Sequence, residues 1–183
     1  MKKNGIRSIV AIGIGTALFI VLSYAAIPLG FIPNTAIQPR VALLAFMTAI
    51  FGPIVGGAIG LLGHALADAI QYGSVWWSWV FPEGVAGVLI GLFVSKYKIE
   101  TGGFGLKQIV LFNVVQVVAN AIAWILIAPV LDILIYAEPA NKVFTQGVTA
   151  FVANIISVGV IGTLLAVAYS KVKSKSSSLS KEN

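Results

Sequence analysis

The chain has 183 residues, of which 58% are hydrophobic and 10% are charged, and its formal net charge is +6. Soluble domains carry about 25% charged residues, so this composition excludes a water-soluble globular protein and indicates a polytopic membrane protein. The chain has no cysteine and one histidine, which excludes disulfides, thiolate chemistry and a His-rich metal site.

Six hydrophobic segments predict an all-α membrane protein, a bundle of six transmembrane helices. In chain order they span residues 8–27, 40–51, 54–70, 77–95, 108–131 and 143–169. The second is about 18 Å long against a hydrocarbon core of about 30 Å, so we expect neighbouring helices to bury it. Residues 1–170 form the predicted membrane domain, and the basic residues 171–183 are expected to be a solvated, disordered cytoplasmic tail.

The distribution of Lys and Arg predicts the orientation, because short loops rich in these residues stay in the cytoplasm. If the N-terminus is inside, the outer side carries only Arg40 and Lys142. The inner side carries the other ten: Lys2, Lys3, Arg7, Lys96, Lys98, Lys107, Lys171, Lys173, Lys175 and Lys181. Both termini are therefore predicted to be cytoplasmic. These residues form no continuous basic face, so no nucleic-acid partner is expected.

The first segment carries small residues at a spacing typical of close helix packing. Ala11 and Gly15 are four residues apart, and so are Gly13 and Ala17. Such pairs let a second helix approach closely in lipid, which makes them candidates for docking a partner protein. Packing inside the bundle is the alternative, above all for Gly15. The basic start of this segment also resembles a secretory signal peptide, but the membrane segments that follow favour a retained helix.

Polar and aromatic side chains concentrate in residues 63–84, which read GHALADAIQYGSVWWSWVFPEG. His64 and Asp68 are four residues apart and share a helix face. Trp76 directly precedes the next segment, on which Trp79 and Glu83 are again four residues apart. Ionisable residues inside membrane segments indicate function by default. With the predicted orientation, all five side chains lie in the outer half of the bundle.

The fifth and sixth segments add amides at a similar depth. Gln116, Asn120 and Trp124 follow an i, i+4, i+8 spacing and form one stripe. Gln146 and Asn154 are eight residues apart and share one face. Four segments thus direct polar or aromatic groups towards one zone, which predicts a pocket that opens outward.

The residue types predict a flat heteroaromatic ligand, because indoles stack on a ring while amides and carboxylates bind its nitrogens and hydroxyls. Asn34 and Gln38 lie in the proline-rich loop on the same side, which can act as a lid. Structural roles are the alternative: a membrane-interface position for Trp76, links between helices for Asn120 and Asn154, a structural pair for His64 and Asp68, and a bend or a pair with Arg40 for Glu83.

Motifs for nucleotide chemistry are missing from the sequence. No GxxxxGK[ST] phosphate loop occurs, and the glycines of TGGFG at residues 101–105 follow no strand, so they are not a dinucleotide fingerprint. No cofactor and no metal are expected, and ATP hydrolysis would have to reside on partner subunits.

These features resemble the S components of energy-coupling factor (ECF) transporters, the substrate-binding membrane subunits of vitamin uptake systems. The runs IPNTAIQPR and FGPIVGGAIGLLGHALADAIQYGSVWWSW are similar to the branch described as ECF-type riboflavin transporter S components. The resemblance covers about residues 5–170.

The resemblance implies a multi-pass cell-membrane protein without enzymatic activity that captures an extracellular vitamin with high affinity. It implies docking through Ala11, Gly13, Gly15 and Ala17 on a transmembrane coupling protein, with two cytoplasmic ATPases driving transport and the S component toppling in the bilayer. Riboflavin is the favoured ligand, and hydroxymethylpyrimidine or a pyridoxine-type vitamin is the alternative.

Two other function classes stay open. A secondary transporter would move protons through His64, Asp68 and Glu83. An intramembrane enzyme would use His64 with Asp68 or Glu83 as acid and base, but the sequence offers no nucleophile motif for it.

Overall fold

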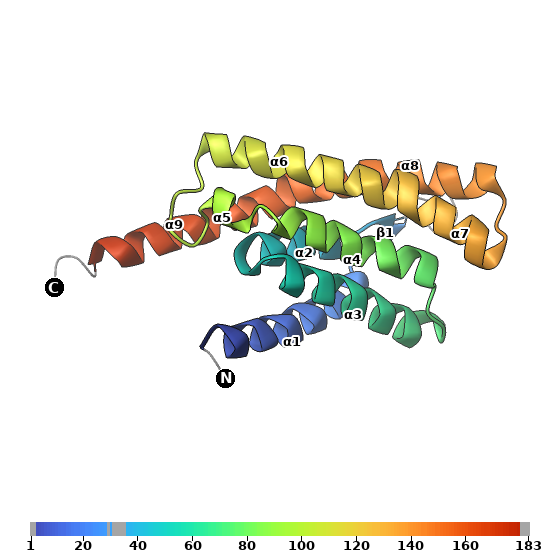
Figure 1. Cartoon of the computed structure of the whole chain (residues 1–183), viewed down its shortest axis with the longest axis horizontal. Coiled ribbons are helices and arrows are strands. Elements are labelled where there is room, and N and C mark those ends of the chain that lie inside the picture. The colour runs from blue at the N-terminus through green and yellow to red at the C-terminus, as the bar shows by residue number, and fades with distance from the viewer. Residues whose placement is uncertain (1–2, 29, 31–35, 180–183) are drawn as a thin grey trace.

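The computed structural model describes residues 3–28, 30 and 36–179, and nearly all of them are helical (Figure 1). The elements in chain order are α1 (Lys3–Ser23), β1 (Ile27–Pro28), β2 (Ala36–Ile37), α2 (Pro39–Phe51), α3 (Pro53–Tyr72), α4 (Trp77–Gly91), α5 (Val94–Tyr97), α6 (Leu106–Asn120), the π-helix η1 (Ala121–Ile127), α7 (Ala128–Tyr136), α8 (Ala140–Ser157), the π-helix η2 (Val158–Gly162) and α9 (Thr163–Leu179).

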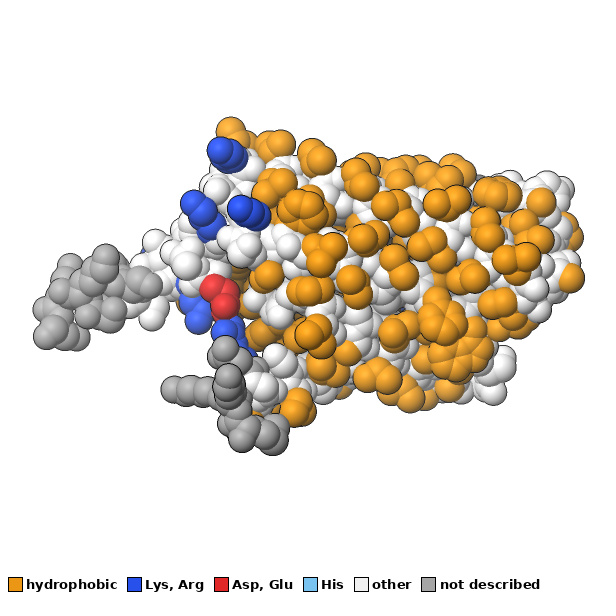
Figure 2. Space-filling view, in the orientation of Figure 1, with side chains coloured by type: hydrophobic (Ala, Val, Ile, Leu, Met, Phe, Trp, Pro, Cys, Tyr) orange, Lys and Arg blue, Asp and Glu red, His pale blue; other side chains and the backbone are white. Residues whose placement is uncertain are grey.

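The long helices run along one axis of the molecule, and both ends of the chain lie at the same end of the bundle (Figure 1). The elements α6, η1 and α7 follow one another without a break, and so do α8, η2 and α9. The surface between the two ends is covered by hydrophobic side chains, and the basic ones gather at the end with the termini (Figure 2). This distribution is that of a membrane-embedded protein.

Four helices of the described residues are long and apolar enough to cross a membrane: Gly5–Ser23, Pro53–Tyr72, Leu106–Tyr136 and Ala140–Ser176. The α2 helix has 13 residues and α4 has 15, so neither spans about 30 Å as a straight helix. Ten of the 13 residues of α2 are buried, as expected for a short helix that its neighbours shield. The all-α membrane class is confirmed, and six crossings remain a prediction.

Several predicted segment bounds differ from the structure. The first helix ends at Ser23, and Ile27 and Pro28 instead pair antiparallel with Ile37 and Ala36 in β1 and β2. The fifth segment continues to Tyr136 and the sixth to Leu179. Residues 171–179, expected to be disordered, are therefore helical. The two π-helical stretches were not predicted, because hydrophobic periodicity alone does not distinguish a local change of helical pitch.

Glycines bring α3 and α4 into backbone contact. A Cβ added at Gly60 would lie 2.7 Å from the carbonyl oxygen of Glu83, and one at Gly87 would lie 2.5 Å from that of Gly56. Only residues without a side chain allow this approach. The close packing sets His64 and Asp68 of α3 opposite Glu83 of α4.

Candidate functional site

Buried polar side chains gather towards the end of the bundle away from the termini, where α3 turns into α4 and α7 into α8 (Figure 1). They form two connected groups. The first, the charged cluster, consists of Arg40, His64, Asp68 and Glu83. The second, the indole cluster, consists of Trp76, Ser78, Trp79, Trp124 and Asp132.

The charged cluster is centred on His64. Its Nε2 lies 3.3 Å from Nη2 of Arg40 and 3.6 Å from Oδ1 of Asp68. Its Nδ1 lies 3.5 Å from Oε2 of Glu83. All four residues are at most 6% exposed, and the Arg40 guanidinium also lies 4.9 Å from the ring centroid of Phe19, a cation–π distance.

The His64 ring lies between a guanidinium and two carboxylates. Its Nε2 faces Arg40, which can only donate hydrogen bonds, and its Nδ1 faces the Glu83 carboxylate. Nε of Arg40 is buried without a hydrogen-bond partner in the described part of the chain. A buried donor without an acceptor costs about 1–3 kcal/mol, so Nε of Arg40 is a candidate for binding an acceptor atom of a ligand.

The indole cluster is built around Asp132 of α7, which is 2% exposed. Its Oδ1 accepts hydrogen bonds from Nε1 of Trp76 and Oγ of Ser78, both at 2.6 Å, and its Oδ2 accepts one from Nε1 of Trp79 at 3.1 Å. Asp132 was not among the predicted site residues, because the fifth segment was expected to end at Leu131. The apolar run 133–136 that follows it was the available signal that the helix continues.

Trp76 connects the two clusters. Its backbone N–H donates to Oδ2 of Asp68 at 3.2 Å, while its indole N–H donates to Asp132. Its ring is 42% exposed and lies 4.8 Å from that of Tyr136. The ring thus has the surface position typical of an interfacial tryptophan, and the polar groups of the same residue hold the site together.

The predicted stripe on the fifth segment is continuous in the structure. Nε1 of Trp124 donates to Oδ1 of Asn120 at 3.1 Å, and Nδ2 of Asn120 donates to the backbone oxygen of Gln116 at 2.8 Å. The Trp124 ring stacks on Trp79 with centroids 5.6 Å apart and an interplanar angle of 28°. The stripe therefore runs into the indole cluster. The η1 helix begins directly after Asn120, and such π-helical turns are frequent at functional sites.

The remaining predicted binding residues lie on neighbouring elements. Gln146 and Asn154 are buried on α8. Gln38 is half-buried directly before α2, and its backbone oxygen accepts a hydrogen bond from Oγ of Ser157 at 3.2 Å. Asn34 lies outside the described residues. The loop that carries Gln38 is thus held against the α8–η2 helix.

The small residues of α1 divide between two faces. Ala11 and Gly15 are buried, and a Cβ at Gly15 would collide with the Ile59 side chain. Gly13 and Ala17 are exposed, with no atom within 4 Å of a Cβ at Gly13. The expectation of one docking face made of all four residues needs correction: Ala11 and Gly15 serve internal packing, the alternative left open for Gly15, and Gly13 and Ala17 alone face outward.

Comparison with known proteins gives a family match. The family described as "ECF-type riboflavin transporter, S component" matches residues 3–171. A UPF0397 protein of Exiguobacterium sp. strain AT1b is 59% identical over 183 residues, covering 100% of both chains. UPF0397 proteins of Lacticaseibacillus casei and Staphylococcus aureus strain Newman are 51% and 53% identical, covering 100% of this chain and 98% and 100% of theirs. No solved structure matches the chain.

Proposed function

Because this chain belongs to the ECF-type riboflavin transporter S component family, we propose that it captures a heteroaromatic vitamin from outside the cell at the charged and indole clusters. The family is a transport subunit and not an enzyme. Delivery into the cell would depend on partner subunits that hydrolyse ATP. Riboflavin is the first ligand to test, and hydroxymethylpyrimidine or a pyridoxine-type vitamin is the alternative.

The observation that carries this proposal is an unpartnered buried donor in a cluster that Trp76 links to an indole stack. Nε of Arg40 has no hydrogen-bond partner among the described residues, and the rings of Trp79 and Trp124 stack on each other. A heteroaromatic ring supplies both complements, a π-face for the indoles and carbonyl or ring-nitrogen acceptors for the donor. Glu83 and Asp68 would accept hydrogen bonds from ring N–H or hydroxyl groups.

Asp132 would act as a positioning residue in this site. By holding Nε1 of Trp79 it sets the orientation of the ring that stacks on Trp124. Two indoles fixed in advance lose little conformational freedom on binding, which favours high affinity.

Ligand entry would require movement of the connection between α1 and α2. The polar side chains of both clusters are largely buried, and Gln38 is hydrogen-bonded to Ser157 of α8. We expect this connection to act as the lid. Breaking the hydrogen bond from Ser157 to the Gln38 carbonyl would be part of its opening.

A proton-coupled secondary transporter is the second candidate. It is favoured by the position of His64, which lies 3.6 Å from Asp68 and 3.5 Å from Glu83, an arrangement that can relay a proton. Uptake that persists after inactivation of the partner ATPases would favour this candidate over an S component.

The partners follow from the family and from the surface of α1. We propose that the exposed Gly13 and Ala17 allow a helix of the transmembrane coupling protein to approach, and that two cytoplasmic ATPases complete the transporter. We further propose that both termini lie in the cytoplasm and that toppling of the subunit in the bilayer carries the ligand inward.

The first experiment is mass spectrometry of the small molecules that co-purify with the protein in detergent. A flavin would support riboflavin as ligand, and a pyrimidine or pyridine vitamin would keep the mechanism and change the substrate. If nothing co-purifies, tryptophan fluorescence is recorded across a vitamin panel. No change for any vitamin would contradict capture at the indole cluster, because a ring stacked on Trp79 or Trp124 must perturb their emission.

A further inference from the structure

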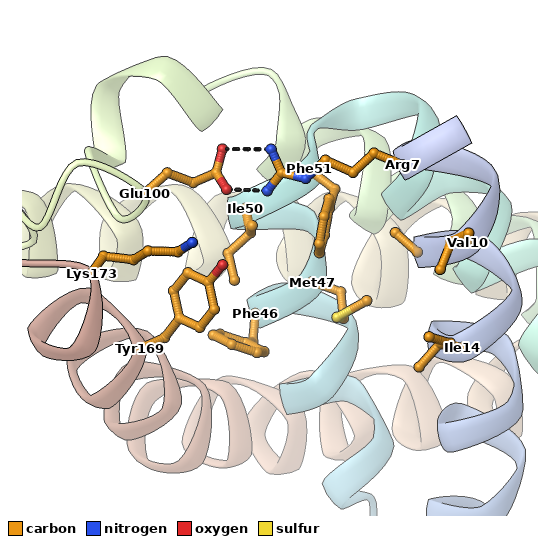
Figure 3. Close-up of a pocket in the computed structure, with 11 residues that line it drawn as sticks. Arg7, Val10, Ile14, Phe46, Met47, Ile50, Phe51, Glu100, Tyr169 and Lys173 are labelled. Atoms are coloured by element: carbon orange, nitrogen blue, oxygen red, sulfur yellow. Dashed lines mark hydrogen bonds and ion pairs between the residues drawn. The ribbon is translucent and has the colours of Figure 1, made fainter. Parts of the chain in front are cut away.

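A groove of about 620 Å³ lies near the end with the termini, between α1, α2 and α9 (Figure 3). It shares no residue with the charged cluster. Its lining consists of Arg7, Val10, Ala11, Ile14, Phe46, Met47, Ile50, Phe51, Glu100, Tyr169 and Lys173. Pockets that take small organic ligands measure about 300–1,000 Å³, so the groove is large enough for an occupant of its own.

The body of the groove is apolar and opens towards the surroundings of the protein. Val10 and Ile14 on α1 are 51% and 55% exposed, and Phe46, Met47 and Ile50 of α2 form the inner wall (Figure 3). From Arg7 to Ile14 the α1 wall is about 10 Å long. In a membrane, the medium in contact with this wall is lipid acyl chains.

The other end of the groove is polar and carries an excess of positive charge. Arg7 is paired with the carboxylate of Glu100, to which its Nη1 donates at 3.2 Å. Lys173 and Tyr169 point into the groove from α9 (Figure 3), with Nζ of Lys173 5.4 Å from the Tyr169 ring centroid. Within the described residues Lys173 has no acidic partner. Two cations and one carboxylate therefore leave one uncompensated positive charge.

We propose that this groove binds an anionic phospholipid of the cytoplasmic leaflet. The first part of an acyl chain lies against Val10, Ile14 and Met47, and the phosphate binds Lys173 with the Tyr169 hydroxyl as a further donor. The cytoplasmic leaflet is rich in anionic lipid, and each nearby cation strengthens binding. The one uncompensated cation at the polar end of the groove can bind one anionic lipid headgroup, and the apolar body of the groove can hold one of that lipid's acyl chains.

The test is native mass spectrometry of the full chain from membranes with equal amounts of phosphatidylglycerol and phosphatidylcholine. The wild type should retain phosphatidylglycerol preferentially. Lys173→Gln should reduce that preference about fivefold, the factor expected for one cation near an anionic surface. Lys171→Gln is the matched control, because Lys171 is an exposed lysine at the same end that does not line the groove.

A second pair of variants tests the apolar wall. Ile14→Trp should fill the groove and abolish lipid retention, while Ile9→Trp, at an exposed position on the same helix outside the groove, should not. Equal retention of both lipids by the wild type, or equal effects of the two lysine variants, would overturn the proposal. A third result would also overturn it. If Ile14→Trp still retains phosphatidylglycerol but no longer forms a complex with the coupling protein, the groove is a protein-docking surface.

Discussion

The carboxylate of Asp132 accepts three hydrogen bonds inside the bundle. The predicted segment boundaries had placed this residue in a loop. Two of the donors are indole N–H groups, which can only donate and therefore need an acceptor inside the bundle. The same carboxylate thus determines where Trp76 and Trp79 lie, although it need not touch a ligand itself.

We expect Asp132→Leu to lower the stability of the protein by several kcal/mol, because it leaves up to three donors unsatisfied at about 1–3 kcal/mol each. Thermal unfolding in detergent would measure this loss. Asp132→Asn keeps the volume and one acceptor oxygen, and should fold while binding the vitamin less tightly. Glu138→Gln, which removes an acid paired with Lys142 nearby, is the control and should change neither quantity. Normal affinity in the Asp132→Asn protein would contradict the positioning role.

Arg40 is the cation of the charged cluster, and its removal should be costly for the same reason. We expect Arg40→Leu to destabilise the fold by about 3–5 kcal/mol, because Asp68 and Glu83 would then be buried without a positive charge. The double variant Arg40→Leu/Glu83→Leu should recover part of this loss. Denaturation curves of the wild type, Arg40→Leu, Glu83→Leu and the double variant measure the coupling. Losses of stability that simply add in the double variant would show that the two residues are not coupled.

At the scale of the element, α1 presents two faces with different tasks. Gly15 packs against Ile59 on α3, while Gly13 and Ala17 face away from the bundle. The helix is therefore both an internal packing element and the proposed docking element. Its two pairs of small residues have the same spacing but different roles, because Ala11 and Gly15 face the bundle while Gly13 and Ala17 face away from it.

We expect Gly15→Leu to destabilise the protein, because a larger side chain meets the Ile59 side chain in a packed interior. Gly13→Leu should leave folding and vitamin binding unchanged and prevent vitamin uptake by blocking close approach of the coupling protein. Ligand titration and uptake assays on the same variants separate the two effects. Full uptake with Gly13→Leu would remove this face from the docking surface.

The α3–α4 pair positions the charged cluster through backbone contact. Because Gly60 and Gly87 each face a backbone carbonyl of the other helix, no rotamer change can make room for a side chain there. The distance between His64 and Glu83 thus depends on glycines a turn away from them, which carry no chemistry of their own.

At the scale of the whole molecule, basic side chains gather at the end of the bundle with the termini (Figure 2), while the charged and indole clusters are buried inside it. With the predicted orientation, the proposed vitamin site opens outward and the proposed lipid groove lies towards the cytoplasm. A subunit that captures on one side and is held by lipid on the other would have its orientation fixed while it waits for ligand.

The predicted orientation can be tested directly, because the chain lacks cysteine. Ser74→Cys, in the exposed turn between α3 and α4, should react with a membrane-impermeant maleimide in intact cells. Ser176→Cys, near the end of α9, should react only after the cells are opened. The reverse pattern would place the termini outside and would contradict an outward vitamin site.

Sequence spacing was enough to identify residues that share one helix face. The stripe of Gln116, Asn120 and Trp124 and the pair His64 and Asp68 were predicted in this way, and the structure brings them together. Asn113 links α6 to α9, because its Nδ2 donates to Oγ1 of Thr163 at 3.0 Å. A repeat of four residues fixes a common face because the helical pitch is local.

The sequence by itself determined the membrane class, most of the helices and the concentration of polar groups around residues 63–84. Tertiary structure alone decided that Asp132 joins the indoles, that Gly15 faces inward while Gly13 faces outward, and that a groove with a charged mouth lies between α1, α2 and α9. The physical reason is the distance along the chain over which each effect acts. Hydrophobicity and helical spacing depend on residues that are close in sequence, whereas the contacts of each helix face depend on how helices far apart in sequence cross and pack.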